Sequence, residues 1–182
     1  MGQTRTLPPV LLVTACFSRH DDARAWARQR MEEAFGPIAL ASESFDFGHT
    51  AYYAPTMGDR LIKQLWAFSR PVDVGLLPAI KRATNALEAE AAALSRWPEE
   101  RPVNLDPGYL EPGKLVLATT KDQAHRLHVG DGIFGEVTLQ WRDGAWQPWP
   151  WTYADYREPV VLAFLTQARE WKRRHPNGDS SR

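Results

Sequence analysis

Along the first hundred residues, apolar positions show helical spacing in two segments and form short continuous runs in others. Between residues 21 and 35, apolar side chains recur at the three- and four-residue spacing of a helix, and Gly36-Pro37 marks its end. An alanine-rich stretch that begins near Pro78 has the same spacing and predicts a second helix. Short apolar runs before and between these helices predict strands. The expected strands are Val10–Phe17, Ile38–Phe47 and Leu61–Phe68.

The second half of the chain is typical of a series of hairpins. Glycine and aspartate, which tolerate the positive φ of tight turns, occur at Gly130–Gly132 and at Asp143-Gly144. Pro107-Gly108 fits the two central positions of a type II turn. A last helix is expected to begin near Asp155, since Glu158 completes the spacing of a capping box. The strands expected here are Lys114–Thr120, His125–Val129, Ile133–Trp141 and Ala145–Trp149.

This order of elements predicts a single α+β domain over residues 1–182. The first six elements follow the β-α-β-β-α-β order of a split βαβ, or ferredoxin-like, core. A β-meander then extends a mostly antiparallel sheet, and a C-terminal helix closes the chain. In such a core Val10–Phe17 is an interior strand, and both early helices cover the same face. Residues 175–182 are polar and are expected to fray.

Charge and cysteine content narrow the possible settings. The chain has 22 basic and 22 acidic residues, so no overall field attracts nucleic acid or a membrane surface. The single cysteine, Cys16, excludes an intramolecular disulfide and fits a reducing compartment, and its apolar neighbours indicate a core position. No signal-peptide pattern is present, and the longest apolar run, Val160–Leu165, is too short to span a bilayer. A cytoplasmic protein without a membrane segment is therefore expected.

Several well-defined site motifs are missing from the sequence. It contains no phosphate-binding P-loop, no glycine fingerprint of a Rossmann fold and no nucleophile elbow. Thr120–Asp122 differs from the guanine-binding N/T-K-x-D motif of GTPases, because the aspartate comes one residue too early. His125 and His128 are three residues apart, which places them on opposite faces of a strand and prevents a shared metal ion. None of the 5 histidines lies in the H-x-S/T motif of the two-histidine phosphoesterases.

Reactive side chains are concentrated between Arg101 and Phe134. Functional groups are often carried on loops held by a rigid sheet, so this region is the predicted site. A lysine, an aspartate and a histidine within a few residues can bind an anion, hold a divalent ion or transfer protons near neutral pH. The candidate catalytic residues are Asp106, Lys121 and His125. The candidate ligand-binding residues are Asp46, Tyr52, Tyr53, Asn104, Tyr109, Thr120, Asp122 and Asp131.

These candidates predict a protein that binds a small anionic ligand, such as a nucleotide or a phosphorylated metabolite, and in the enzyme alternative acts on it. The cofactor stays open, with a divalent cation held by carboxylates as one alternative. A purely structural alternative also stays open. In that case Asn104 and Asp106 cap the Pro107-Gly108 turn, and Lys121-Asp122 is a solvated turn.

The 8 tryptophans allow a different interpretation. Large rings usually build a core or one face of a sheet, and this is the favoured explanation. The alternative is an RNA-binding or protein-interaction module in which a sheet face stacks bases and arginines meet phosphates. Zero net charge argues against nucleic acid as the partner. The residues of this alternative are Trp141, Trp146, Trp149, Trp151, Arg126 and Arg142.

Distinctive segments over nearly the whole chain carry a resemblance to a known family. The most specific are N-L-D-P-G-Y at Asn104–Tyr109 and T-K-D-x-x-H-R at Thr120–Arg126. The others are Phe35–Pro37, Phe45–Phe47, Tyr52-Tyr53, Met57-Gly58, Lys114–Asp122, Gly130–Gly132 and Pro150–Tyr156. On these residues the chain resembles the bacterial and archaeal family filed as domain of unknown function 4416. The resemblance implies membership but no reaction or ligand.

Overall fold

Nine strands form one sheet in the computed structural model, which describes residues 2–3, 7–48 and 52–178. The order of hydrogen-bonded neighbours is β2-β4-β1-β5-β6-β8-β7, with β3 added to β4 and β9 added to β8. Every pairing is antiparallel, so the expected large antiparallel sheet in a mixed α and β fold is confirmed. The strands are β1 (Val10–Ser18), β2 (Ile38–Ala41), β3 (Phe45–Phe47), β4 (Leu61–Val72), β5 (Asn104–Glu111), β6 (Lys114–Thr119), β7 (Leu127–Gly130), β8 (Ile133–Arg142) and β9 (Ala145–Pro148).

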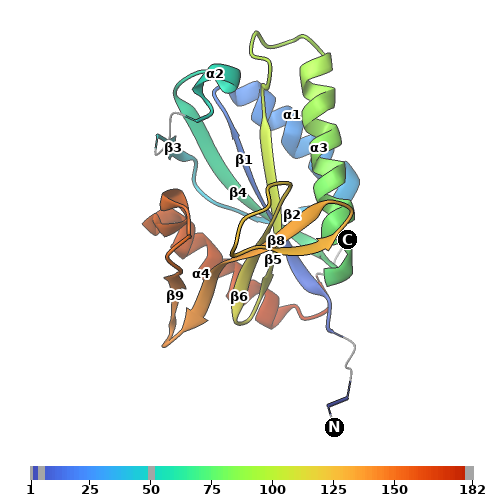
Figure 1. Ribbon diagram of the computed structural model, residues 1–182, viewed down its shortest axis with the longest axis vertical. Helices are drawn as coiled ribbons and strands as arrows, with labels where there is room; N and C mark the ends of the chain where they lie inside the picture. Colours follow the sequence, from blue (N-terminus) through green and yellow to red (C-terminus); the bar gives the residue numbers. More distant parts are fainter. Residues whose placement is uncertain (1, 4–6, 49–51, 179–182) are drawn as a thin grey trace.

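Helices cover both faces of this sheet. Figure 1 shows α1 and α3 together on one face and the C-terminal helix α4 on the other. The predicted helices at residues 21–35 and near Pro78 are confirmed, while the short α2 was not expected from the sequence. The helices are α1 (Asp21–Phe35), α2 (Ala54–Met57), α3 (Leu77–Ala93) and α4 (Pro159–Arg174), with 3-10 turns η1 (Val74–Leu76) and η2 (Ala154–Arg157).

Strand β1 is the centre of the core, because it lies between β4 and β5 and is buried along its whole length. Its alternate side chains serve the two layers. Leu12 and Cys16 pack with α1 and α3, whereas Leu11 and Val13 pack with α4. Cys16 is fully buried as the sequence indicated, and burial raises the pKa of its thiol, so the group stays protonated and unreactive at neutral pH.

Strands β5 and β6 form a fork in the sheet. Their pairing covers only Gly108–Glu111 and Lys114–Leu117, whereas β5 continues alongside β1 as far as Asn104. Gly108 lies at the branch point, where a Cβ atom would stand 2.2 Å from the carbonyl oxygen of Val116. The adjacent Pro107 has no N–H to contribute to a further pair. The two strands therefore separate beyond Gly108 and leave room between them.

This arrangement overturns the predicted turn at Pro107-Gly108. Both residues lie inside β5, opposite Thr14 and Val13 of β1. The Pro-Gly signal marks the branch of the fork, where pairing with β6 ends and the backbones approach closely, instead of a reversal of the chain. The alternative in which Asp106 caps that turn is therefore wrong.

Several other element boundaries differ from the sequence prediction, and two of these differences have a specific physical cause. Ile38–Phe47 forms two strands on β4 instead of one, because Ser42 interrupts it and its Oγ accepts a hydrogen bond from the Leu65 N–H at 2.9 Å. Asp155 does not cap the last helix: it lies in η2 with its carboxylate buried against another strand, and α4 begins at Pro159. The predicted cap failed because a buried ion pair takes the same carboxylate.

The structure also describes both predicted hairpin turns and the first part of the C-terminal tail. Asp131 (φ 53°) and Asp143 (φ 52°) are left-handed at the expected turns. At the C-terminus, the His175 ring stacks on Trp171 with 4.6 Å between ring centroids. Residues 179–182 of the expected frayed tail lie outside the described residues, as do residues 49–51 of the loop after β3. Within the described part of the chain, no helix is long and apolar enough to cross a membrane.

Candidate functional site

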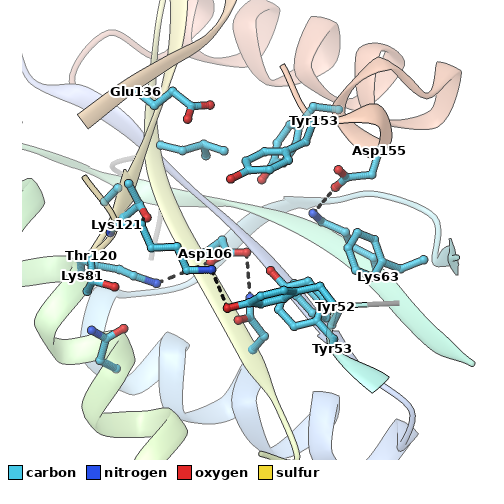
Figure 2. A pocket seen from close by; sticks show the side chains of 18 of the residues that line it. Tyr52, Tyr53, Lys63, Lys81, Asp106, Thr120, Lys121, Glu136, Tyr153 and Asp155 are labelled. Carbon is cyan, nitrogen blue, oxygen red and sulfur yellow. Dashed lines mark hydrogen bonds and ion pairs between the residues drawn. The ribbon is translucent and has the colours of Figure 1, made fainter. Parts of the chain in front are cut away.

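A cavity of about 450 Å³ opens at the fork between β5 and β6. Side chains from β1, β3, β4, β5, β6 and β8 line it, together with helix α3, the turn η2 and the loops that carry Tyr52, Arg101 and Lys121 (Figure 2). Its volume lies within the range of about 300–1,000 Å³ that is usual for small-molecule sites. A site of this kind needs polar groups converging on one space, and the lining supplies them.

Five cationic and three acidic side chains share this lining. Lys121 is the one cation among them that forms no ion pair with a carboxylate within the described residues. The cavity therefore carries an excess of positive charge although the whole chain is neutral. The other four cations are paired: Lys63 with Asp155, Lys81 with Asp106 at 3.5 Å, Arg126 with Glu136 at 2.8 Å, and Arg101 with Glu88 at 2.7 Å.

Lys63 is buried on β4, with 3 % of its side chain exposed. Its ammonium donates a hydrogen bond to the Asp155 carboxylate of η2. The same nitrogen lies 5.4, 5.0 and 4.5 Å from the ring centroids of Phe17, Phe47 and Tyr156. A paired charge within an aromatic cage is held in one place, so this ion pair joins η2 to the central sheet at one side of the cavity.

Asp106 is held from two directions by buried partners. Its Oδ2 accepts a hydrogen bond from the Asn104 amide at 2.8 Å, and its Oδ1 lies 3.5 Å from Lys81 Nζ. Lys81 comes from α3 and also donates to the Leu105 carbonyl at 2.9 Å. Both partners are almost fully buried, whereas 31 % of the Asp106 side chain is exposed. The carboxylate is thus fixed in orientation and open to the cavity (Figure 2).

Glu136 occupies the β8 side of the cavity and is nearly saturated. Its Oε2 accepts hydrogen bonds from Arg126 Nε at 2.8 Å and lies 3.1 Å from His125 Nε2. Thr138 Oγ1 donates to the other oxygen at 3.3 Å. Arg126 also donates to the Tyr153 hydroxyl at 2.8 Å. These contacts leave Glu136 little capacity for a ligand, so its role in the lining is to position Arg126.

Lys121 and Tyr52, which lie on two different loops, meet at the cavity. Lys121 Nζ donates to the Tyr52 hydroxyl at 2.9 Å and lies 4.2 Å from the centroid of its ring (Figure 2). The hydrogen bond and the charge of Lys121 lower the pKa of the Tyr52 phenol, because they stabilise the phenolate. In contrast, burial raises the pKa values of Tyr53 and Tyr156. These two phenols stay protonated at neutral pH and are available as hydrogen-bond donors.

Of the predicted site residues, seven lie in or beside the cavity and four lie elsewhere. His125 is next to the cavity, where it contacts Glu136 and stacks on Trp151 at 5.1 Å. The cavity itself brings together Tyr52, Tyr53, Asn104, Asp106, Thr120 and Lys121.

Four other candidates lie elsewhere. Asp46 is exposed on β3, where alternation turns it away from the cavity that its neighbour Phe47 lines. Tyr109 is buried in a separate cluster with Val10 and Leu77, and burial raises the pKa of its phenol. Asp122 is exposed after β6, and Asp131 forms an exposed ion pair with Arg82 at 3.2 Å.

Sequence reasoning missed most of the charged lining, which includes Lys63, Lys81 and Arg101. A signal for two of them was present. Lys63 has the same parity on β4 as the buried Leu61 and Leu65, and Lys81 lies one turn after the buried Leu77 of α3. A lysine at an apolar position costs free energy unless it has a partner, so it points to a buried ion pair or a polar cavity. No comparable periodicity marks Arg101, which lies in an irregular loop.

The tryptophans do not form an open stacking platform. Trp146 is buried and packs edge-to-face on Trp141, whose ring lies under Arg169 of α4 at 4.1 Å. Trp149 and Trp151 stack on each other at 5.3 Å. All eight rings are buried or partly buried. Arg126, expected to meet phosphates in the RNA alternative, is instead buried with Glu136 because its charge needs a partner there.

The donor set favours anions over metal ions. Within the described residues there is no group of three or more His, Cys, Asp or Glu side chains placed to hold a metal ion. Each carboxylate in the lining already has a cationic neighbour. The ammonium of Lys121, which has no acidic partner within the described residues, and the phenols of Tyr53 and Tyr156 are hydrogen-bond donors, and the open carboxylate of Asp106 is an acceptor.

Comparison with known proteins identifies the family of the chain. No curated protein and no solved structure matches the chain. A family match covers residues 8–171, which includes the whole sheet, α4 as far as Trp171 and every residue of the cavity lining. The chain therefore belongs to the family described as Domain of unknown function (DUF4416).

Proposed function

We propose that the fork cavity, the space between β5 and β6, binds a small anionic molecule such as a nucleotide or a phosphorylated metabolite. The observation that carries this proposal is the lining of five cations against three carboxylates, with Lys121 left without an acidic partner in the described residues. An anion entering the cavity completes the charge balance that the protein alone leaves unsatisfied.

The position of the charges supports the same proposal. Lys63, Lys81 and Arg126 are buried and already neutralised by carboxylates, so they give the cavity a rigid polar frame. Lys121 is exposed, and among the described residues its ammonium contacts only the Tyr52 phenol, so it can exchange that contact for a stronger one with phosphate. Hydrogen bonds between ionised partners are stronger than those to neutral groups.

Thermal-shift and titration calorimetry with inorganic phosphate, pyrophosphate and a panel of nucleoside phosphates test the proposal. We expect at least one of these anions to raise the melting temperature and Lys121→Met to weaken its binding about tenfold, equivalent to about 1.4 kcal/mol. Lys114→Met is the matched control, since this lysine lies at the far end of β6 beside Glu111. If no anion stabilises the wild type, or if both variants bind equally, the cavity is not an anion site.

We also infer that β1, α1, β2, β4, α3 and β5 constitute a split βαβ core of the ferredoxin-like type. The strand order β2-β4-β1-β5 supports this inference, as does the packing of α1 and α3 against the same residues, including Trp66 and Leu105. In this scheme β6 to β9 are an extension of one edge. The cavity would then lie at the junction between core and extension, where β5 and β6 separate.

A further inference from the structure

Asp106 poses a problem for an anion site, because its carboxylate repels the ligand that the neighbouring cations attract. The repulsion is tolerable when the ligand itself presents donors to the carboxylate, or when a metal ion lies between them. The described residues supply no cluster of three metal-ligating side chains. The remaining solution is a ligand that carries neutral hydrogen-bond donors beside its anionic group.

The contacts of Asp106 leave capacity for such donors. A carboxylate accepts about four hydrogen bonds. Asp106 receives one at 2.8 Å from Asn104 and has Lys81 at 3.5 Å, a distance beyond good hydrogen-bond geometry. The other two carboxylates of the lining are less accessible: the Asp155 side chain is 7 % exposed and paired with Lys63, and the Glu136 side chain is 3 % exposed and contacted by three separate side chains. Asp106 is therefore the acceptor that the cavity presents to its ligand.

The surroundings of Asp106 favour hydroxyl groups over amines. Lys81 Nζ lies next to the carboxylate, and Lys121 lines the same cavity, so a second ammonium group would be repelled. Tyr52 and Tyr53 add aromatic rings to the lining, packed edge-to-face at 5.0 Å. Such rings offer an apolar surface for the carbon skeleton of a ligand, while polar groups at few positions set its orientation.

We infer that the ligand of the fork cavity is a phosphate ester with a hydroxylated carbon skeleton, such as a sugar or polyol phosphate, whose hydroxyl groups donate to Asp106. This inference rests on the proposed function, since it names the ligand class of the same cavity. Asp106 supplies the selectivity for hydroxyl groups, and Lys121 supplies the attraction for the phosphate.

Titration calorimetry with four phosphate esters at one ionic strength tests the assignment. Ribose 5-phosphate, glucose 6-phosphate and glycerol 3-phosphate carry hydroxyl groups, and ethyl phosphate carries the same anion without them. We expect at least one hydroxylated ester to bind the wild type tenfold or more tightly than ethyl phosphate. In Asp106→Asn this preference should fall to within about threefold, while ethyl phosphate binds as well or better because a negative charge is gone.

Two controls keep the outcomes distinct. Asp143→Asn alters an exposed turn carboxylate paired with Arg142 and should leave the preference unchanged, and thermal melts establish that each variant is folded. If the esters bind but hydroxyl groups bring no gain, or if Asp106→Asn keeps the preference, the ligand class is wrong while anion binding stands. If all four esters fail to bind, this inference fails, and the proposed function falls with it when inorganic phosphate, pyrophosphate and the nucleoside phosphates also leave the melting temperature unchanged.

Discussion

Removing the charge of Asp155 should destabilise the fold more than its place at the cavity border suggests. Asp155 and Lys63 lie 92 residues apart in the chain, with 7 % and 3 % of their side chains exposed. The near-isosteric Asp155→Asn leaves the Lys63 ammonium buried among Phe17, Phe47 and Tyr156 without an anion. Breaking a buried pair from one side costs about 3–5 kcal/mol. We expect about 3 kcal/mol, since the cavity beside the pair admits water.

The measurement is urea and thermal unfolding of Asp155→Asn, Lys63→Met and the double variant. For a domain of this size, about 3 kcal/mol lowers the melting temperature by about 6–12 °C. The double variant removes both charges, so its destabilisation should be smaller than the sum of the single effects by about 2 kcal/mol. A cost below about 1 kcal/mol for Asp155→Asn, or simple additivity, would refute the claim that this ion pair anchors η2 to the sheet.

Three further predictions concern the fork and its surroundings. Gly108→Ala should cost about 1–3 kcal/mol in urea unfolding, because a Cβ there would stand 2.2 Å from a carbonyl oxygen of β6, whereas Gly113→Ala, with open space, should change little. Burial raises the pKa of Glu88 above its ordinary 4.5, so the folded state binds its proton more tightly and the contribution of this group to stability is lost as pH rises through the raised pKa. The wild type should therefore lose stability relative to Glu88→Gln as the pH rises above about 4.5. The melting temperature of Glu88→Gln minus that of the wild type should increase over this range, and a difference that stays constant with pH would contradict the prediction. Because Lys121 lowers the pKa of Tyr52, the ultraviolet tyrosinate titration should show a low-pKa phenol that moves upward in Lys121→Met and disappears in Tyr52→Phe.

The sequence predicted the elements well where one period dominated. The helix over residues 21–35 and the strand at Val10–Phe17 follow from apolar spacing alone, and the structure has both. Pro107-Gly108 was misassigned because the same dipeptide that suits a turn also suits a strand at the point where its neighbour departs. Local chemistry cannot separate these cases, since the close approach of Val116 that requires glycine depends on tertiary pairing.

The sequence indicated only part of the cavity lining, because tertiary packing brings the other lining residues together. Asn104, Asp106 and Lys121 lie in one segment dense in reactive groups, so composition indicated them. Lys63 and Lys81 come from elements whose pattern reads as core, and their partners are distant in the chain. Which carboxylate neutralises which lysine depends on how α3 and η2 pack against the sheet, and no single segment of the sequence specifies that packing.

The ion pairs in the cavity lining therefore determine which charged side chains can bind a ligand. Within the described residues, each of the other cations in the lining has a carboxylate partner, whereas Lys121 has none and Asp106 is a partly exposed carboxylate with capacity for a further hydrogen bond. They come from opposite branches of the fork, Asp106 from β5 and Lys121 from the loop after β6. Substitutions that close the fork should abolish ligand binding without touching either residue, because a binding site of this kind depends on the separation of the two strands as much as on their side chains.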